Sequence, residues 1–522
     1  MILYGMGMRQ GFSVLNILGV TFLFFLTTML SFGYGFDVFK ANFILFTAYM
    51  MYINPFELSI KKMRICFGGG IILFGLFFFL NAKIYCPIFF SLFMILMLFM
   101  SNNKNDYNLS VFIIAIAVMF NLNFISCTRI GDVQYDFASC YNYIEYILDN
   151  NFMFWNENPI LTRPSYSDYH PILHFFIGAI AIRLGTLMSF SVEAANEGMQ
   201  IVFLFYMLWY YIICSKILKT IGLNGIVYIA MLSFVSMFPS YNAISGFINN
   251  DALLLPMCAS IIYYSLLYHI NGDRKSLSLI VLFATLASLT KLSGILVLGA
   301  TGLVFLYKLL KNRNKNTFIE IFVASFLILI GISIWPIYQH FVLDIGFGYV
   351  PPQEHLSLKQ YTLWERFNPL SAFVYEKTYY NDFGTNLWET MTKTALFGQW
   401  DFSYRGNKII WLIVFDILLY KIILGLYLVG LLYLMLKNYK DFNVWFVVLL
   451  ILGIIGGQIA FGLKHPYMCN QDFRYVAILS LLIAMVIGLF TKKLPNFVKY
   501  SISVIIFMFS LSSMVMWWWI AW

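Results

Sequence analysis

The chain has 522 residues, of which 61% are hydrophobic and only 11% are charged. Charged residues make up about a quarter of an ordinary soluble domain, so this composition excludes a soluble globular protein. The formal net charge of +9 at pH 7 would suit an anionic partner such as nucleic acid. In so apolar a chain, however, the Lys and Arg clusters are needed to fix the orientation of membrane spans. We therefore expect an integral membrane protein and no nucleic-acid partner.

Apolar runs long enough to cross a hydrocarbon core of roughly 30 Å recur along nearly the whole chain. When the basic loops are placed inside, the sequence predicts about fifteen spans, with the N-terminus inside and the C-terminus outside. Four of these spans come first, near residues 12–31, 38–54, 66–81 and 86–101. They make residues 1–108 an additional N-terminal helical unit.

A fifth predicted span, near residues 109–127, leads outward into a polar segment that starts at Thr128 and ends at Pro171. The segment interrupts an otherwise nearly continuous apolar sequence, and its acidic residues outnumber its basic ones. Carboxylates and a histidine at the point where the chain leaves the membrane suggest a reaction centre at the bilayer surface. The acidic residues are Asp132, Asp136, Glu145, Asp149, Glu157 and Asp168.

The next apolar run, residues 171–187, is hydrophobic enough to span. If it spanned, however, the four basic residues between Lys308 and Lys315 would lie outside, against the positive-inside rule. We therefore interpret it as a juxtamembrane helix in the outer interface, with Pro171 in its first turn. The first outer loop then covers residues 128–197.

Six further spans complete the predicted core, residues 109–337, and lead to a second large outer loop, residues 338–408. The aromatic residues of this second loop suit sugar stacking and interfacial anchoring equally. Four C-terminal spans follow in residues 409–522. The predicted spans of these two regions lie near residues 198–214, 225–241, 251–270, 276–290, 293–309, 318–337, 409–436, 443–462, 476–490 and 500–518.

Asp132 follows a span by about one turn, at the depth where lipid headgroups meet water. A carboxylate there could act as a general base that takes a proton from an acceptor hydroxyl. It could equally cap the next helix by accepting hydrogen bonds from free N–H groups. Position alone does not separate these two roles.

His170 precedes Pro171, which places it at the cap of the expected interfacial helix, where free N–H groups and the helix dipole form an anion site. The alternative is a histidine that only reaches toward water. His170 and His174 have the spacing of a metal pair, but no third ligand is suitably spaced. The seven Cys contain no CxxC pair. We therefore assign no metal ligand and no certain cofactor, and a divalent metal remains an alternative.

Two cations stand at predicted outer ends of helices. Lys291 lies in an outer turn where the positive-inside rule requires no cation, which makes it a candidate phosphate contact. Arg474 starts another span, where a guanidinium can hold a phosphate with two hydrogen bonds. Either side chain could instead anchor to phospholipid headgroups. Asn249, Asn250 and Asp251 start a third span on the same side, where helix capping explains all three.

The order and side of these features resemble the GT-C glycosyltransferases, most of all the protein O-mannosyltransferase and lipid A aminoarabinose transferase type. The resemblance covers roughly residues 109–475, and two positions depart from it. Val133 stands where a second acid is frequent in the family, and Ile172 stands where a second Pro is usual. The matching positions are Asp132, His170-Pro171, Asp251, Thr290-Lys291 and, more loosely, Arg474-Tyr475.

The resemblance implies an all-α polytopic membrane protein with a GT-C-like transmembrane core and two long extracytoplasmic loops that carry juxtamembrane helices. It implies a multi-pass enzyme of the bacterial inner (plasma) membrane that transfers one sugar, with inversion, from a polyprenyl-phosphate donor to a glycan, glycolipid or protein acceptor. In this assignment Asp132 is the catalytic base, and the donor phosphate is bound by His170, Lys291 and Arg474. Substrate binding is assigned to Asp251, Asp168 and Tyr169.

Two other classes of function fit the composition. A transporter or flippase of lipid-linked glycans would also be polytopic, but such proteins place polar sites near the bilayer midplane. A polymerase or ligase of envelope polysaccharide would share the lipid donor and would move a whole glycan. The polar residues of this chain collect at one predicted face, which favours an enzyme at the membrane surface.

Overall fold

A computed structural model describes residues 21–30, 38–80, 86–101, 105–128, 130–131, 137–153, 169–346, 349–374, 384–398 and 409–520. Within these residues the regular structure is helical, with one isolated β-bridge between Ser357 and Tyr467 and no β-strand. The prediction of an all-α protein is confirmed for this part of the chain.

The helices fall into an N-terminal layer, a central bundle and shorter elements. The layer contains α2 (Val38–Ile53), α3 (Ile60–Leu80) and α4 (Cys86–Met100). The bundle contains α5 (Asp106–Cys127), α9 (Val192–Thr220), α10 (Gly225–Ser236), α11 (Ser240–Gly246), α12 (Asn250–Asn271), α13 (Arg274–Thr290), α14 (Leu298–Asn312), α15 (Lys315–Phe341), α20 (Ile410–Lys437), α21 (Phe442–Lys464), α22 (Leu479–Thr491) and α23 (Asn496–Ile520). The shorter elements are α6 (Phe137–Asp149), α8 (Leu173–Leu187), η4 (Leu292–Val297), η5 (Glu354–Leu356), α16 (Leu363–Phe367), α17 (Ser371–Val374), α18 (Leu387–Phe397), η7 (Met468–Gln471) and η8 (Phe473–Val476).

Among the described residues, eight helices are long and apolar enough to cross a membrane, and the bent pair α10 and α11 would make a ninth. The chain is therefore a multi-pass integral membrane protein. Four predicted spans form α2, α4, α13 and α22, which have 16, 15, 17 and 13 residues and are shorter than this criterion requires. The predicted span near 225–241 is broken after Ser236, where α10 and α11 meet at a bend of 49°. The count of about fifteen spans thus stays a prediction.

The helix ends that were predicted to lie outside are gathered at one end of the bundle. Phe124, near the end of α5, packs against Trp517, near the end of α23, with ring centroids 5.5 Å apart. The same Trp517 donates a hydrogen bond to the carbonyl of Leu396 at the end of α18. At the opposite end, the N–H of Gly225 at the start of α10 donates to the carboxylate of Asp106 at the start of α5. These contacts agree with the predicted alternation, and we call the end that contains Trp517 the loop end.

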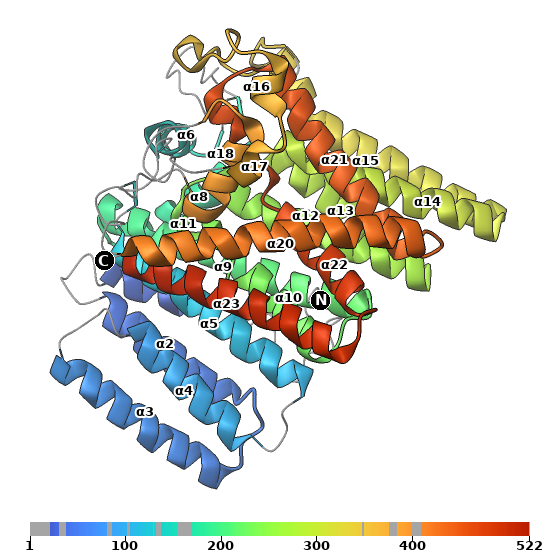
Figure 1. The fold of residues 1–522 in the computed structure, drawn as a ribbon. Helices are drawn as coiled ribbons and strands as arrows, with labels where there is room; N and C mark the ends of the chain where they lie inside the picture. Colours follow the sequence, from blue (N-terminus) through green and yellow to red (C-terminus); the bar gives the residue numbers. More distant parts are fainter. Residues whose placement is uncertain are drawn as a thin grey trace.

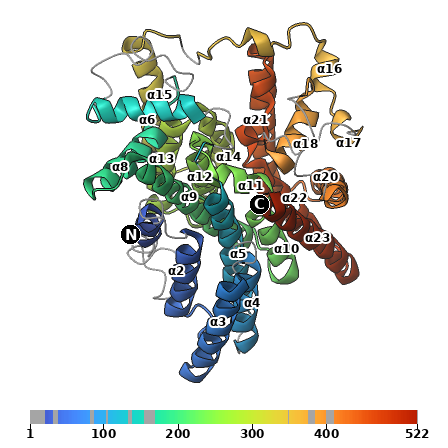
Figure 2. The same ribbon diagram turned by 90° about the vertical axis from the view of Figure 1, so that its left-hand side faces the viewer.

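Figure 1 shows α6 and α16 to α18 gathered at this loop end. Figure 2, turned by 90°, shows the N-terminal layer of α2, α3 and α4 at the lower end of the view, where α4 lies against α5. The loop end therefore combines short helices that lie outside the long bundle with the ends of the long helices. Polar side chains brought to this end come from many parts of the sequence.

α8 is the element for which the sequence left most doubt about membrane crossing. It has 15 residues and packs closely against α9, because a Cβ at Gly185 would lie 2.7 Å from the Cβ of Ala195. Its length is below that of a typical span, as the interfacial interpretation requires. α22, which we predicted to span, is shorter still, so length alone does not decide the position of α8 and the interpretation stays a prediction.

Candidate functional site

The predicted site residues Asp132 and Asp168 lie outside the described residues. Asp251, Lys291 and Arg474 are described and come from three separate segments, the start of α12, the end of α13 and η8. Tyr169 and His170 precede α8. The structure brings the first three together at the loop end of the bundle.

The start of α12 is tied to the end of α13 by its asparagines. The Asn249 side chain is the N-cap of α12 and accepts a hydrogen bond of 2.9 Å from the N–H of Asp251. Asn250 uses its side-chain amide to donate to the carbonyl of Thr290, at 3.3 Å. Capping is thus confirmed for Asn249, whereas the Asp251 carboxylate is left to make another contact.

That contact is an ion pair with Lys291. Lys291 Nζ lies 2.6 Å from Asp251 Oδ1, and the two side chains are only 9% and 2% exposed. Lys291 itself is the C-cap of α13 and has an extended backbone, which turns its side chain away from the helix axis. Burial lowers the pKa of the Lys291 ammonium, and the neighbouring Asp251 carboxylate opposes this shift. Lys291, which the sequence suggested as a phosphate contact, is therefore one member of a buried ion pair.

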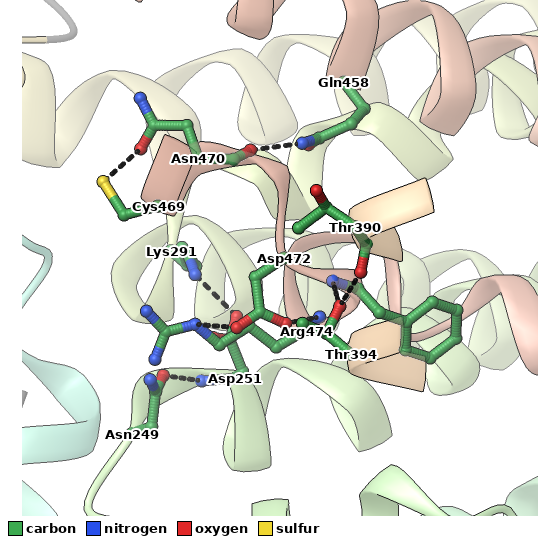
Figure 3. Close-up of polar contacts among 11 residues, drawn as sticks. Asn249, Asp251, Lys291, Thr390, Thr394, Gln458, Cys469, Asn470, Asp472 and Arg474 are labelled. Carbon is green, nitrogen blue, oxygen red and sulfur yellow. Dashed lines mark hydrogen bonds and ion pairs between the residues drawn. The ribbon is translucent and has the colours of Figure 1, made fainter. Parts of the chain in front are cut away.

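Arg474 reaches the same place from η8. Its Nε lies 3.5 Å from Asp472 Oδ2, and Asp472 also accepts a hydrogen bond from the backbone N–H of Arg474. Lys291 Nζ and the Arg474 guanidinium lie 4.3 and 5.3 Å from the centre of the Tyr475 ring. Figure 3 shows Lys291, Asp251, Asp472 and Arg474 converging. Both cations thus lie beside one aromatic ring, and each is paired with a carboxylate. Both are too buried to bind the headgroups of the surrounding lipid.

The loop that carries Arg474 is held by neighbours on both sides. Gln458 of α21 donates to the carbonyl of Asn470 at 2.6 Å, and Thr394 of α18 accepts a hydrogen bond of 2.8 Å from the N–H of Phe473. Thr390 donates to the side-chain oxygen of Gln471 at 3.2 Å. These bonds fix the backbone on which Asp472 and Arg474 stand, so the cation is presented by a rigid segment.

A small pocket opens beside this cluster, with a cavity volume of about 20 Å³. Its walls come from α12, η4, α21 and the segment that leads from η8 into α22. The polar lining residues include Asp251, Ser293 and Arg474. Leu254, Leu296 and Ile478 are among the apolar lining residues, and each lies about one turn from one of these polar residues. The arrangement suits an amphipathic ligand that has an anionic group and a hydrocarbon part.

Tyr169 and His170 belong to a different group of contacts. The carbonyl of Tyr169 accepts hydrogen bonds from Trp335 Nε1 at 3.3 Å and from Gln339 Nε2 at 2.9 Å, both on α15. The Tyr169 and His170 rings are adjacent, with centroids 4.2 Å apart. The contacts of Tyr169 thus place it against α15, whereas Asp251 and Lys291 contact each other and η8.

The expected cap at His170 was placed wrongly. α8 begins at Leu173, its N-cap is Ile172, and no side chain caps it. Pro171 therefore precedes the helix, and His170 stands outside the first turn. His174 is fully buried, and its ring lies 5.1 Å from the Phe203 ring. Within the described ranges, no group of three His, Cys, Asp or Glu could hold a metal ion.

The base of the loop that carries Asp132 is anchored by a residue that the sequence analysis did not select. The N–H of Ile130 donates to both carboxylate oxygens of Glu197, at 3.3 and 3.2 Å, and Glu197 is buried near the start of α9. Gly131 follows with a φ of +94°, which favours glycine. Asp132 is the next residue, so Glu197 holds the backbone two residues before it.

Comparison with known proteins does not supply a family for this arrangement. No protein-family model matches the chain, and no curated protein is significantly similar to it. The site is therefore interpreted from its own residues: a buried cluster of two cations and two carboxylates, beside an amphipathic pocket, at the loop end of a multi-pass membrane bundle.

Proposed function

We propose that the chain is a membrane-embedded inverting glycosyltransferase of the GT-C type, which moves a sugar from a polyprenyl-phosphate donor to a cell-envelope acceptor at the extracytoplasmic face. The observation that carries the proposal is the convergence of Lys291 and Arg474 beside a pocket whose lining also contains several apolar side chains. A polyprenyl-phosphate sugar has this combination of an anionic centre and a hydrocarbon chain.

The geometry supports a role for the two cations in bond breaking. When a glycosidic bond to phosphate breaks, negative charge grows on the leaving phosphate. Cations that are already fixed stabilise this charge without further reorganisation. Asp251 and Asp472 hold Lys291 and Arg474 in position, and burial strengthens the interaction of each cation with an entering anion.

The carboxylates also limit which anions enter. The two positive charges of the cluster are balanced by two negative ones, so the cluster does not attract every anion strongly. A ligand must gain binding energy elsewhere, and the apolar side chains of Leu254, Leu296 and Ile478 offer that energy to a prenyl chain.

The acceptor side of the reaction is assigned to Asp132, which would take the proton from the acceptor hydroxyl as the sugar is transferred. This assignment rests on the resemblance and on the anchoring of the preceding Ile130 by Glu197. Only the resemblance assigns His170 to the donor phosphate and Tyr169 and Asp168 to the substrate, because the contacts of Tyr169 lie on α15. No cofactor is required in this scheme, and the enzyme would work in a bacterial plasma membrane on a glycan, glycolipid or protein.

One observation favours a second candidate, a flippase or transporter of lipid-linked glycans. The break of 49° between α10 and α11 gives a discontinuous helix, and transporters often form their substrate sites from such helices. Phe238 at this break stacks on Phe473 of η8, so the break adjoins the charged cluster. We prefer the enzyme because it also accounts for the resemblance of the sequence to the GT-C type.

Mass spectrometry of envelope glycans from cells that carry or lack the gene tests the proposal. A transferase predicts the loss of one monosaccharide from an otherwise intact glycan, protein or glycolipid. A flippase predicts the loss of whole units, and a polymerase or ligase predicts short or unattached chains; either result would contradict the proposal.

The variant Asp132→Asn sharpens the same experiment. It is expected to reach the membrane in normal amounts and to leave the glycan without the added sugar, because an amide cannot accept the proton. Full addition of the sugar by this variant would remove Asp132 from the role of base. Wild-type protein expressed from the same vector is the control.

A further inference from the structure

We propose that Asp251 and Ser293 form a specificity-determining pair that binds a hydroxyl group of the sugar in the pocket. The inference rests on the proposed function, and it deepens that function by assigning the part of the ligand that this polar corner recognises. It separates recognition of the sugar from binding of the phosphate, which is assigned to the cations Lys291 and Arg474.

The first observation concerns Asp251. Its Oδ1 is used by Lys291 at 2.6 Å, but its Oδ2 is buried and has no hydrogen-bond partner among the described residues. Asp251 is 1% exposed, and it lines the pocket. A buried carboxylate oxygen without a donor is costly, so such an atom on a residue that lines a pocket indicates a place for a donor from a ligand.

The second observation is independent and comes from η4. The hydroxyl of Ser293 is also buried without a partner in the described part of the chain, and Ser293 lines the same pocket as Asp251. A serine hydroxyl both donates and accepts, whereas a carboxylate only accepts. Together the two side chains fit a group that donates one hydrogen bond and accepts another, and a sugar hydroxyl is such a group.

The other lining residues of the pocket are consistent with separate binding of the sugar and the phosphate. Arg474 lines the wall from which an anionic group can be bound, and Leu254 and Leu255 continue the Asp251 face of α12 as an apolar surface. A hydroxyl group is small enough to enter this pocket, and the phosphate and hydrocarbon chain of the same ligand can contact Arg474 and the leucines at its mouth.

Ser293→Ala is the variant to test, because it removes one hydroxyl and leaves the buried ion pair intact. Affinity is measured with the full-length protein in lipid nanodiscs, using sugar-free polyprenyl phosphate and a panel of polyprenyl-phosphate hexoses and pentoses. Wild-type protein is expected to bind at least one sugar-bearing lipid more tightly than the sugar-free lipid. Ser293→Ala is expected to lose roughly 2- to 10-fold of affinity for that sugar lipid, as for one neutral hydrogen bond, and none for the sugar-free lipid.

Two matched variants control for packing. Ser293→Thr keeps a hydroxyl and should retain the preference for the sugar lipid, whereas Cys258→Ala changes an apolar part of the same pocket and should affect both lipids alike. The inference is overturned if Ser293→Ala keeps the wild-type preference, or if wild-type protein binds both lipids equally. If wild-type protein binds neither lipid, the proposed function fails together with the inference.

Discussion

Replacing Lys291 by Met should destabilise the protein strongly, because it leaves Asp251 as a buried carboxylate without its cation. Methionine keeps an unbranched side chain, one heavy atom shorter than that of lysine, and removes the charge. The Asp251 side chain is only 2% exposed, so the small water-accessible part of its carboxylate compensates little for the lost partner. Removing one member of a buried pair costs about 3–5 kcal/mol, whereas replacing both members is often close to neutral.

The double variant Asp251→Asn with Lys291→Met isolates the pair. We expect it to lose less stability than Lys291→Met alone, because no unpaired charge remains. Arg274→Met is a matched control at the opposite end of α13: it breaks the pair with Glu320, in which the arginine side chain is 81% exposed. An exposed pair contributes at most about 1 kcal/mol.

The assay is equilibrium unfolding of the purified full-length protein in mixtures of a mild detergent and SDS, followed by tryptophan fluorescence and circular dichroism. The three variants are compared with wild type at equal protein and lipid content. The reasoning would be refuted if Lys291→Met were no less stable than Arg274→Met. It would also be refuted if the double variant were less stable than Lys291→Met.

Three further predictions concern binding, the loop and the topology. Because burial lowers the pKa of Lys291, affinity for sugar-free polyprenyl phosphate should fall as the pH rises, at a lower pH than the loss of a proton from an exposed lysine would require. Lys291→Arg, which stays protonated, should flatten that profile, and an equal decline in both proteins would contradict the assignment. Glu197→Ala should accelerate hydrogen exchange at the Ile130 amide, since both acceptors of that N–H are lost; unchanged protection would show that the loop is held otherwise. A cysteine at the exposed Ser189 in an otherwise cysteine-free chain should react with an impermeant reagent added outside, and one at the exposed Arg313 should not; the reverse pattern would invert the topology.

The positions of the cations at helix ends could be predicted from the sequence, because basic loops fix the direction of each helix. Asp251 starts α12, Lys291 ends α13 and Arg474 precedes α22, so alternation sends all three to the same end. Their pairing could not be predicted. It depends on which helices are neighbours and on how each one is rotated, and an apolar run in lipid carries little information about either.

Most of the hydrogen bonds that hold the site in place could not be predicted from the sequence either. Asp472 lies two residues before Arg474 and caps η8, and this local spacing could have predicted the contact between them. Glu197 and Thr394 act on backbone groups that are far away in the sequence, at Ile130 and Phe473. Such contacts are set by tertiary packing, and a buried glutamate or threonine has no distinctive spacing to reveal it.

The sharing of Tyr475 by two ion pairs has a consequence for how the sequence can change. Loss of any single member, Asp251, Lys291, Asp472 or Arg474, leaves one uncompensated charge next to an aromatic ring in a buried place. Divergence of this protein should therefore proceed by joint replacements, in which an acid and its base disappear or exchange together. A related protein that keeps one member of either ion pair without the other would need compensating substitutions among the residues around Tyr475.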